Sequence, residues 1–311
     1  MSTLLPVVYK ILPLYLFIVL GFFAGRRLQI DKDTVAKLLI YVIAPMIVFH
    51  GAVSANLQLG LILVPIVFYV TATVLCLCTY LIAKRVWPNT AENKTSNILA
   101  FSAGTGNTGY FGLPIAVALF GPASLSVVVF TSLGGILYEN TVGFYITARG
   151  HHTASEALWK IAKLPTLYAF IAGLLLHALP IASNQNYLDV ITLVRGAYSV
   201  LGMMIIGFGL ANLKNVKVDW KYVTTALSLK FIAVPLVFLC IVWLDAHTVQ
   251  LFSSEIVRVL LLMSVVPLAS NTITYAALLK THPEQAAVAV ASSTVLAAVT
   301  IPLTLHWFGL L

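Results

Sequence analysis

Two segments rich in glycine, proline and small polar residues interrupt otherwise apolar stretches of the chain. The first runs from Ala103 to Pro114, and in the second Pro267 precedes Ser270-Asn271-Thr272. Glycine lowers helix stability, and proline cannot donate a backbone hydrogen bond to the residue four positions earlier. We therefore predict that the first segment unwinds and that the second does so less completely. Freed backbone groups, with the side chains of Asn271 and Thr272, could then coordinate an ion or a carboxylate.

Two ionisable residues also lie within apolar stretches, where charge is costly and usually functional. Lys230 stands five residues before Pro235 and is either a cation that balances an anionic ligand or a lysine whose ammonium reaches an interface with water. Glu139 is the most centrally placed acid, and we predict that its carboxyl takes up and releases a proton. A purely structural role stays open for both residues.

The composition places these residues in a membrane protein. Hydrophobic residues make up 60% of the 311-residue chain and charged residues only 9%, whereas soluble chains carry about 25% charged residues. A spanning helix needs about 20 mostly apolar residues, because the hydrocarbon layer offers no partner to a free backbone group. We therefore predict an all-α polytopic membrane protein whose ten spans are approximately 7–24, 35–53, 57–82, 96–120, 123–146, 158–178, 190–211, 222–244, 257–279 and 286–310.

The basic residues alternate from loop to loop between these runs. Lys and Arg gather around the odd-numbered loops, whereas Arg258 is the exception at the even-numbered ones. Loops that stay in the cytoplasm collect Lys and Arg, which predicts a cytoplasmic (inner) membrane location with both termini outside. The same bias explains the net charge of +8, so no nucleic-acid partner is needed.

The two halves of the chain show weak internal similarity. Val64-Pro65-Ile66-Val67-Phe68 matches Val234-Pro235-Leu236-Val237-Phe238, and Gly106-Asn107-Thr108 matches Ser270-Asn271-Thr272. Because each half contains an odd number of predicted spans, the second must enter the membrane from the opposite side. This predicts two inverted five-helix repeats, residues 1–150 and 151–311, with a site between discontinuous helices near the middle of the membrane.

The same residues carry a family resemblance. The segments Gly106 to Pro114, Val266 to Thr272 and Pro283 to Ala287 resemble the auxin efflux carrier family in its short bacterial form, and the resemblance extends over the whole chain. It implies a fold similar to that of bile acid/sodium symporters, with broken helices 4 and 9 that cross. It also implies a scaffold of spans 1, 2, 6 and 7, a moving core of spans 3–5 and 8–10, and elevator-like movement. Implied substrates are organic anions, such as auxin in plants and malate or malonate in some bacterial relatives.

These observations predict a secondary transporter of a small organic anion, either a monocarboxylate or a dicarboxylate. A proton or a sodium ion is the coupling candidate, Glu139 is the coupling residue, and the lipid bilayer surrounds the chain. Assembly as a homodimer stays open. The predicted substrate site consists of ten residues: Gly106, Asn107, Thr108, Gly109, Pro114, Lys230, Pro267, Ser270, Asn271 and Thr272.

Three alternatives differ in class. A passive anion facilitator or channel would need no coupling residue, and a symporter of the bile-acid type would use sodium. An intramembrane enzyme needs paired carboxylates, a metal cluster, or a nucleophile with a base. The spans contain no HExxH or Asp-rich motif, and Asp245 with His247 at the outer end of span eight is the exception to the lack of an acid close to a histidine. We also expect no cofactor, metal site or disulfide, because Cys76, Cys78 and Cys240 all fall inside predicted spans.

Overall fold

The computed structural model describes residues 4–28, 30–87, 94–148, 162–211, 218–278 and 281–309, and these ranges contain helices but no strand. The helices of the first half are α1 (Leu4–Arg27), α2 (Lys32–Leu38), η1 (Leu39–Ile43), α3 (Ala44–Val53), α4 (Leu59–Val86), α5 (Thr95–Gly104), η2 (Thr108–Gly112), α6 (Leu113–Phe120), α7 (Ser124–Tyr138), η3 (Glu139–Gly143) and α8 (Phe144–Ala148). The helices of the second half are α10 (Pro165–Leu175), η4 (Pro180–Ser183), α11 (Gln185–Ala211), α12 (Trp220–Ser228), η5 (Leu229–Ala233), α13 (Val234–His247), α14 (Ser254–Val265), α15 (Asn271–Leu278) and α16 (Pro283–Trp307).

Six helical segments of the described chain are long and apolar enough to cross a membrane: Thr34–Val53, Leu59–Val86, Ser124–Thr147, Gln185–Ala211, Trp220–His247 and Pro283–Trp307. The outward face of α4 agrees with this assignment. Ile62, Ile66, Val70 and Val74 follow one another at helical spacing, and all four are exposed. An exposed apolar stripe of this length suits lipid rather than water.

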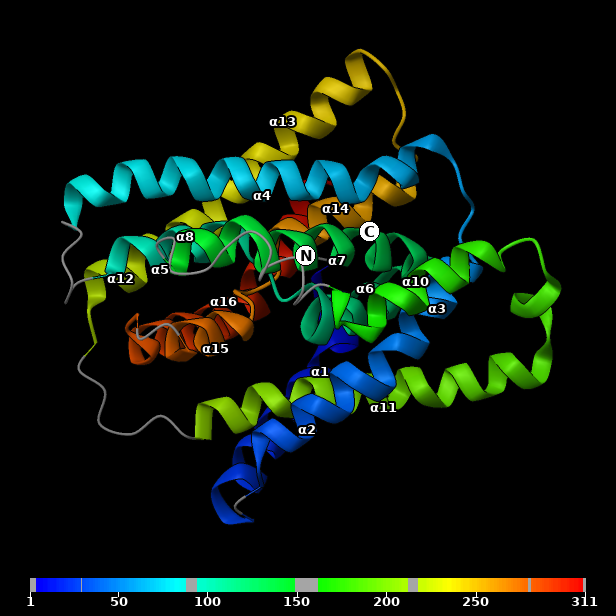
Figure 1. The fold of residues 1–311 in the computed structure, drawn as a ribbon, viewed down its shortest axis with the longest axis horizontal. Helices are drawn as coiled ribbons and strands as arrows, with labels where there is room; N and C mark the ends of the chain where they lie inside the picture. The colour runs from blue at the N-terminus through cyan, green and yellow to red at the C-terminus, as the bar shows by residue number, and fades with distance from the viewer. Residues whose placement is uncertain are drawn as a thin grey trace.

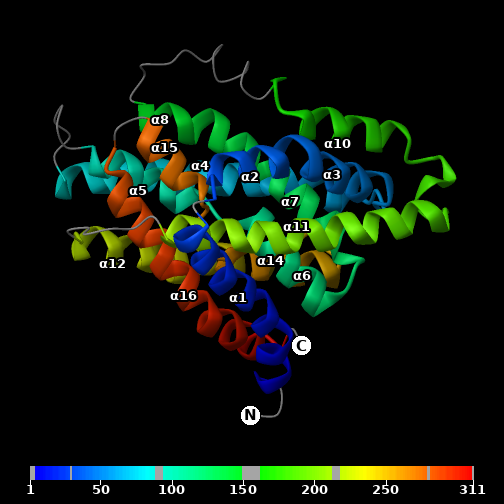
Figure 2. The ribbon, with the colours of Figure 1, turned by 90° about the horizontal axis from the view of Figure 1, so that it is seen from below.

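Two long helices lie on opposite sides of the helices that contain the breaks. Figure 1 shows α4 on one side and α11 on the other, with α5, α14 and α15 between them and α13 projecting beyond α4. From the side, α1 and α16 extend together from the body (Figure 2) and are in contact. The most extensive helix pairs are α1 with α11 and α3 with α10. Gly21 and Gly207 permit the first pair, because a Cβ on either would collide with the backbone of the partner helix.

Three helices contain a π-turn just before a proline. The turns η1, η2 and η5 are followed within two residues by Pro45, Pro114 and Pro235. In each case the residue four positions before the proline lies inside the π-turn, where the missing N–H and the ring of the proline would disturb an ordinary α-helix. Pro114 thus widens its helix, whereas the complete loss of helix lies earlier.

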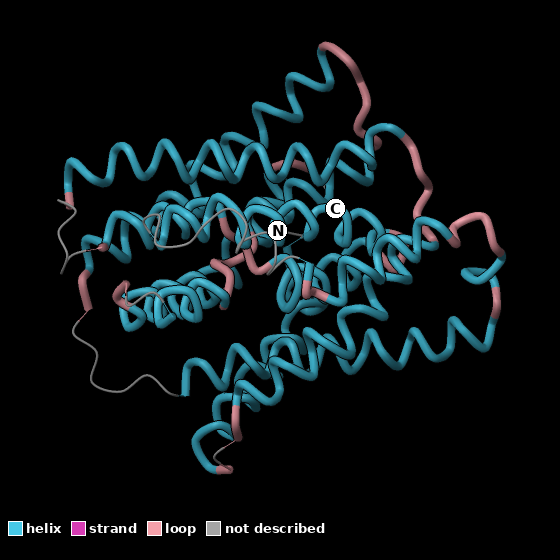
Figure 3. The backbone as a smooth tube through the Cα atoms, in the orientation of Figure 1, coloured by secondary structure: helices cyan, strands magenta, loops and turns pink. Residues whose placement is uncertain are grey.

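The helices at the fourth and ninth predicted runs are divided in two. Residues 105–107 separate α5 from η2, and residues 266–270 separate α14 from α15. Both breaks form short loops among the helices (Figure 3). They contact each other directly, because the Asn107 N–H donates to the Pro267 carbonyl at 2.9 Å. The second break is longer than the first, contrary to the sequence expectation, because Pro267 and Ser270 both lie within it and the next helix begins only at Asn271.

Candidate functional site

A cavity of about 290 Å³ opens where the two breaks meet. Its polar side is formed by the breaks and by η3, and it includes Asn107, Thr108, Glu139, Ser270 and Asn271. Its apolar side comes mainly from η1, α3 and α7 and consists of Ile40, Ala44, Ile47, Val48, Val129 and Ile136. Glu139 is the sole member of the described lining that is Asp, Glu, Lys, Arg or His. The cavity therefore suits a ligand with one polar end and an apolar body.

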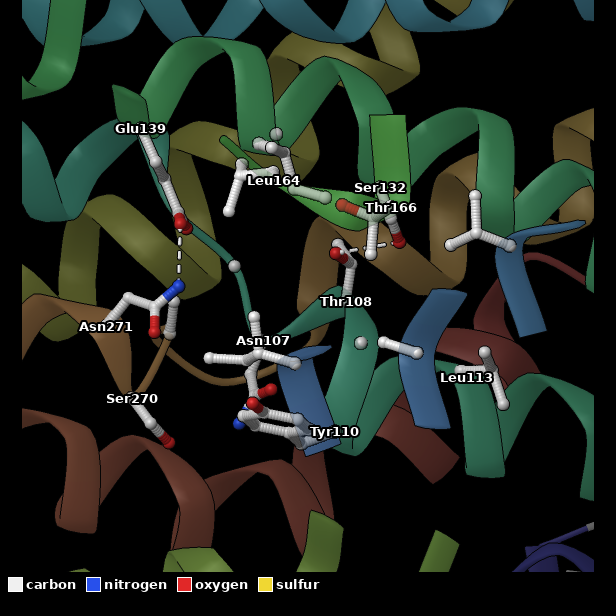
Figure 4. A pocket seen from close by; sticks show the side chains of 18 of the residues that line it. Asn107, Thr108, Tyr110, Leu113, Ser132, Glu139, Leu164, Thr166, Ser270 and Asn271 are labelled. Carbon is white, nitrogen blue, oxygen red and sulfur yellow. Dashed lines mark hydrogen bonds between the residues drawn. The ribbon is translucent and has the colours of Figure 1, made fainter. Parts of the chain in front are cut away.

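Glu139 and Asn271 join two separate helices across the polar side. The Asn271 Nδ2 donates to Glu139 Oε2 at 2.9 Å, as drawn in Figure 4. The glutamate is only 6% exposed, whereas Asn271 is open to the cavity. Among the described residues, the Asn271 amide is the hydrogen-bond donor that reaches this buried carboxyl, and a buried polar group needs such a partner.

The π-turn that begins at Glu139 has no proline after it. Instead, Asn140 Nδ2 donates to the Ile136 carbonyl at 2.9 Å and Thr141 Oγ1 to the Leu137 carbonyl at 2.6 Å. Side chains that bond to carbonyls one turn earlier compete with the helical ladder. The other end of Asn140 accepts from the Tyr275 hydroxyl at 3.0 Å, which connects η3 to α15.

The first break provides further polar groups. Ser132 Oγ donates to Thr108 Oγ1 at 3.1 Å, on the side of the cavity away from Asn271 (Figure 4). The Asn107 side chain is 4% exposed, and its Nδ2 is buried without a hydrogen-bond partner among the described residues. Unpaired buried donors are uncommon and call for an explanation. Because Nδ2 has almost no open surface, the amide would have to turn for this nitrogen to reach a ligand in the cavity.

The N-terminal ends of the divided helices make one side of the cavity electrostatically positive. The helical segments η2–α6 and α15 begin at Thr108 and Asn271, which both line the cavity. Their positive N-terminal ends therefore lie beside it, and such ends favour anions.

Lys230 lies behind the first break rather than in the cavity. Its side chain is 2% exposed, and Nζ donates to the Thr105 carbonyl at 3.3 Å, just beyond the C-terminal end of α5. A positive group is favourable at that end of a helix. No carboxylate among the described residues forms an ion pair with it. Gly106 separates Nζ from the cavity, and a Cβ at this glycine would lie 3.0 Å from Nζ.

The ten residues predicted for the site thus fall into two groups. The structure brings Gly106, Asn107, Thr108, Gly109, Ser270 and Asn271 to the cavity, together with Glu139. Pro114, Pro267, Thr272 and Lys230 do not line it. Pro267 holds the two breaks together through its carbonyl, and Thr272 Oγ1 lies 3.4 Å from Thr105 Oγ1 in the interior.

Sequence reasoning missed several polar residues of the lining, including Ser132, Asn140, Thr166, Tyr198 and Tyr275. A signal existed for the first of these. Ser132 lies seven residues before Glu139 and therefore on the same helix face. Tyr198 and Tyr275 come from helices distant in the sequence, so only the tertiary structure brings them to the cavity.

Comparison with known protein families indicates the same class of protein. The family described as "Membrane transport protein" matches residues 6–157 and 147–305. The chain belongs to this family. That membership confirms the resemblance to auxin efflux carriers and identifies the protein as an integral membrane transport protein.

Two curated relatives are archaeal. The chain is 27% identical over 174 residues to an uncharacterised transporter of Methanocaldococcus jannaschii, covering 53% of this chain and 56% of the relative. It is 26% identical over 178 residues to an uncharacterised transporter of Methanothermobacter thermautotrophicus, covering 57% of each chain. The chain thus spans little more than half the length of these relatives, and both are described as transporters.

Proposed function

We propose that this protein is a secondary transporter of a small organic anion, with the substrate bound where the two divided helices meet. One observation carries the proposal: Asn107 and Asn271, from the two breaks, line one cavity, and the Asn107 amide nitrogen lacks a partner. Two amide side chains and two helix N-termini can hold a carboxylate without a full positive charge.

The lining favours a monocarboxylate with an apolar body over a dicarboxylate such as malate or malonate. A second carboxylate would lie near Ile47 and Val129, where Ser132 offers a neutral hydroxyl but no described side chain offers a positive charge. An aromatic or branched acid would instead bury its apolar part against these side chains.

Ten spans in two inverted repeats, residues 1–150 and 151–311, form the proposed architecture. The close pairs α1 with α11 and α3 with α10 support a scaffold built from spans 1, 2, 6 and 7. The divided helices, with spans 3, 5, 8 and 10, then form a core that moves in an elevator-like manner. Cysteine labelling that placed the C-terminus on the cytoplasmic side of the membrane would overturn this topology.

Glu139 is the proposed coupling residue. A passive facilitator would need no ionisable group in its cavity, whereas Glu139 lines this one together with the proposed anion-binding amides. A proton-coupled carrier uses such a carboxyl to bind the driving ion beside the substrate.

A thermal-shift screen of purified protein tests the proposed substrate class. A bound ligand stabilises the native state in proportion to the logarithm of its concentration over Kd. Phenylacetate and indole-3-acetate should raise the melting temperature more than malonate and malate do, and Asn107→Ala should remove the shift. An equal response of wild type and Asn107→Ala, or no response to any acid, contradicts the proposal.

A further inference from the structure

We propose that the side-chain amide of Asn271 is a relay that reverses its orientation when Glu139 gains or loses a proton, and that only one orientation accepts an anion. This inference rests on the proposed function and adds the step that connects the proton to the substrate. It makes Asn271 a substrate-binding residue through which the charge state of Glu139 acts on the cavity.

The relay follows from the position of Asn271 between two partners. Its amide contacts the buried Glu139 carboxyl on one side and the cavity on the other. Figure 4 shows the amide nitrogen directed at Glu139 and the amide oxygen directed away from it. A primary amide has a donor end and an acceptor end, so whichever end meets Glu139 leaves the opposite chemistry for the cavity.

An ionised carboxylate can only accept hydrogen bonds. It therefore holds the Asn271 Nδ2 toward itself, which is the arrangement observed at 2.9 Å. The amide oxygen is then left for the cavity, where it repels the carboxylate of an organic anion. The negative charge of Glu139 opposes the same anion, so this state disfavours binding.

Protonation reverses the arrangement. A proton from water bonds to Oε2, and the N–H···O bond from Asn271 breaks. The new O–H donates to Oδ1 of Asn271 after the amide turns about its Cβ–Cγ bond. The Nδ2–H groups then face the cavity and donate to the anion. Deprotonation on the other side of the membrane restores the first orientation and releases the anion.

The surroundings leave this role to Asn271. Among the described residues, the titratable side chains close enough to feel the charge of Glu139 are the phenols of Tyr110 from η2, Tyr138 from α7 and Tyr275 from α15. The Tyr138 hydroxyl donates to the Phe101 carbonyl, and that of Tyr275 donates to Asn140, so neither is directed at the carboxyl. Lys230 bonds to the far side of the first break.

The relay has a consequence for the electrical balance of transport. The empty cavity contains the ionised Glu139, and the loaded cavity contains a neutral Glu139 with one monocarboxylate. Each state has one negative charge, so the core carries the same charge across the membrane whether loaded or empty. Proton and monocarboxylate transport is therefore expected to be electroneutral.

Infrared difference spectroscopy between low and high pH tests the relay without any substrate. Protein is prepared with isotope-labelled asparagine side chains, so that amide bands shift away from those of glutamine. Wild type should show a carboxyl band and an asparagine amide band that change over the same pH range. Glu139→Gln should remove both changes, and Asn271→Ala should remove only the amide change. Asn140→Ala is the matched control, because this asparagine lines the same cavity, and the amide change should survive.

Three results would overturn the relay: a carboxyl change with no accompanying amide change, an amide change that persists in Asn271→Ala, or no carboxyl change that depends on Glu139. Glu139→Asp and Asn271→Ser serve if the first variants fail to fold: Glu139→Asp should shift the carboxyl band, and Asn271→Ser should remove the amide change. Failure of the transport proposal looks different, since it leaves the infrared result intact while every acid in the thermal-shift screen is without effect.

Discussion

Glu139 and Lys230 are buried on opposite sides of the first break, and their side chains face different surroundings. Glu139 begins the π-turn η3 and lines the cavity, whereas Lys230 lies in the π-turn η5 and bonds to the Thr105 carbonyl. Both are nearly inaccessible to water. The comparison shows that a charge in mid-span indicates a special environment but does not tell which surface the charge serves.

The difference assigns separate tasks to the two charges. Under the proposed function, the acid acts within the cavity, where a change of its protonation would alter the groups that a ligand contacts. The lysine acts on the backbone of the break, where it stabilises the C-terminal end of α5. Changes on the Glu139 side should therefore alter coupling and affinity, and changes on the Lys230 side should alter them less.

The largest effect is expected for Glu139→Gln. Glutamine is neutral at every pH and can donate to Asn271 Oδ1, so the cavity should stay in the state that accepts an anion. Accumulation driven by a pH gradient in proteoliposomes should be lost entirely, while exchange of labelled for unlabelled phenylacetate continues. Binding assays should still detect the anion. Accumulation at the wild-type level would place coupling elsewhere.

The second effect concerns the two amides that the cavity brings together. Asn107→Ala and Asn271→Ala should each weaken phenylacetate binding about 10- to 100-fold, because a hydrogen bond to a charged group contributes about 1.5–3 kcal/mol. Isothermal titration measures the affinity. Size-exclusion chromatography should show that both variants stay monodisperse. Normal affinity in both would mean that the breaks serve close helix packing alone.

Much of this arrangement could be predicted from the sequence, because it depends on local chemistry. Glycine and proline located the first break, and the pairing of Gly106-Asn107-Thr108 with Ser270-Asn271-Thr272 indicated the second. The position of Glu139 within a long apolar run indicated a special role. Each of these signals comes from residues close together in the chain.

The remaining features depend on how helices rotate and pack. The hydrogen bond between Glu139 and Asn271 joins residues 132 positions apart in the chain. Lys230 contacts the Thr105 carbonyl because the π-turn η5 sets the direction of its side chain. A π-turn shifts every later side chain around the helix axis, so simple helical spacing fails beyond it. The effect of Pro114 was predicted as unwinding, yet the helix continues through it as η2 and α6.

A third, smaller effect is expected for Lys230→Met, which keeps most of the volume but removes the amino group. Replacing an unpaired buried charge by an apolar side chain removes a desolvation cost. The melting temperature without ligand should therefore change little, because this gain offsets the loss of the hydrogen bond to the Thr105 carbonyl. Phenylacetate affinity should fall by less than in Asn271→Ala, because the amino group lies behind the break. Lys230→Gln retains a donor for the Thr105 carbonyl and separates the loss of charge from the loss of the hydrogen bond. If Lys230→Met lost as much phenylacetate affinity as Asn271→Ala, the Lys230 side of the break would contribute to binding as much as the Glu139 side.

The smallest effect is expected for Gly106→Ala, because Gly106 forms the wall between the two sides. The added Cβ would lie 3.0 Å from Lys230 Nζ and 3.2 Å from Val266 Cγ2, and the end of the lysine can move by a few tenths of an ångström. Overpacking against a flexible neighbour should lower the free energy of unfolding by about 1 kcal/mol, and phenylacetate affinity should fall by at most about fivefold. If the cost arises at the lysine, the effects of Gly106→Ala and Lys230→Met should be non-additive in a double-mutant cycle. Gly109→Ala is the matched control, since its Cβ would meet the Tyr198 hydroxyl at 2.9 Å instead, and its effect should add to that of Lys230→Met. If the effects of Gly106→Ala and Lys230→Met on affinity were additive, Gly106 would not couple Lys230 to the cavity.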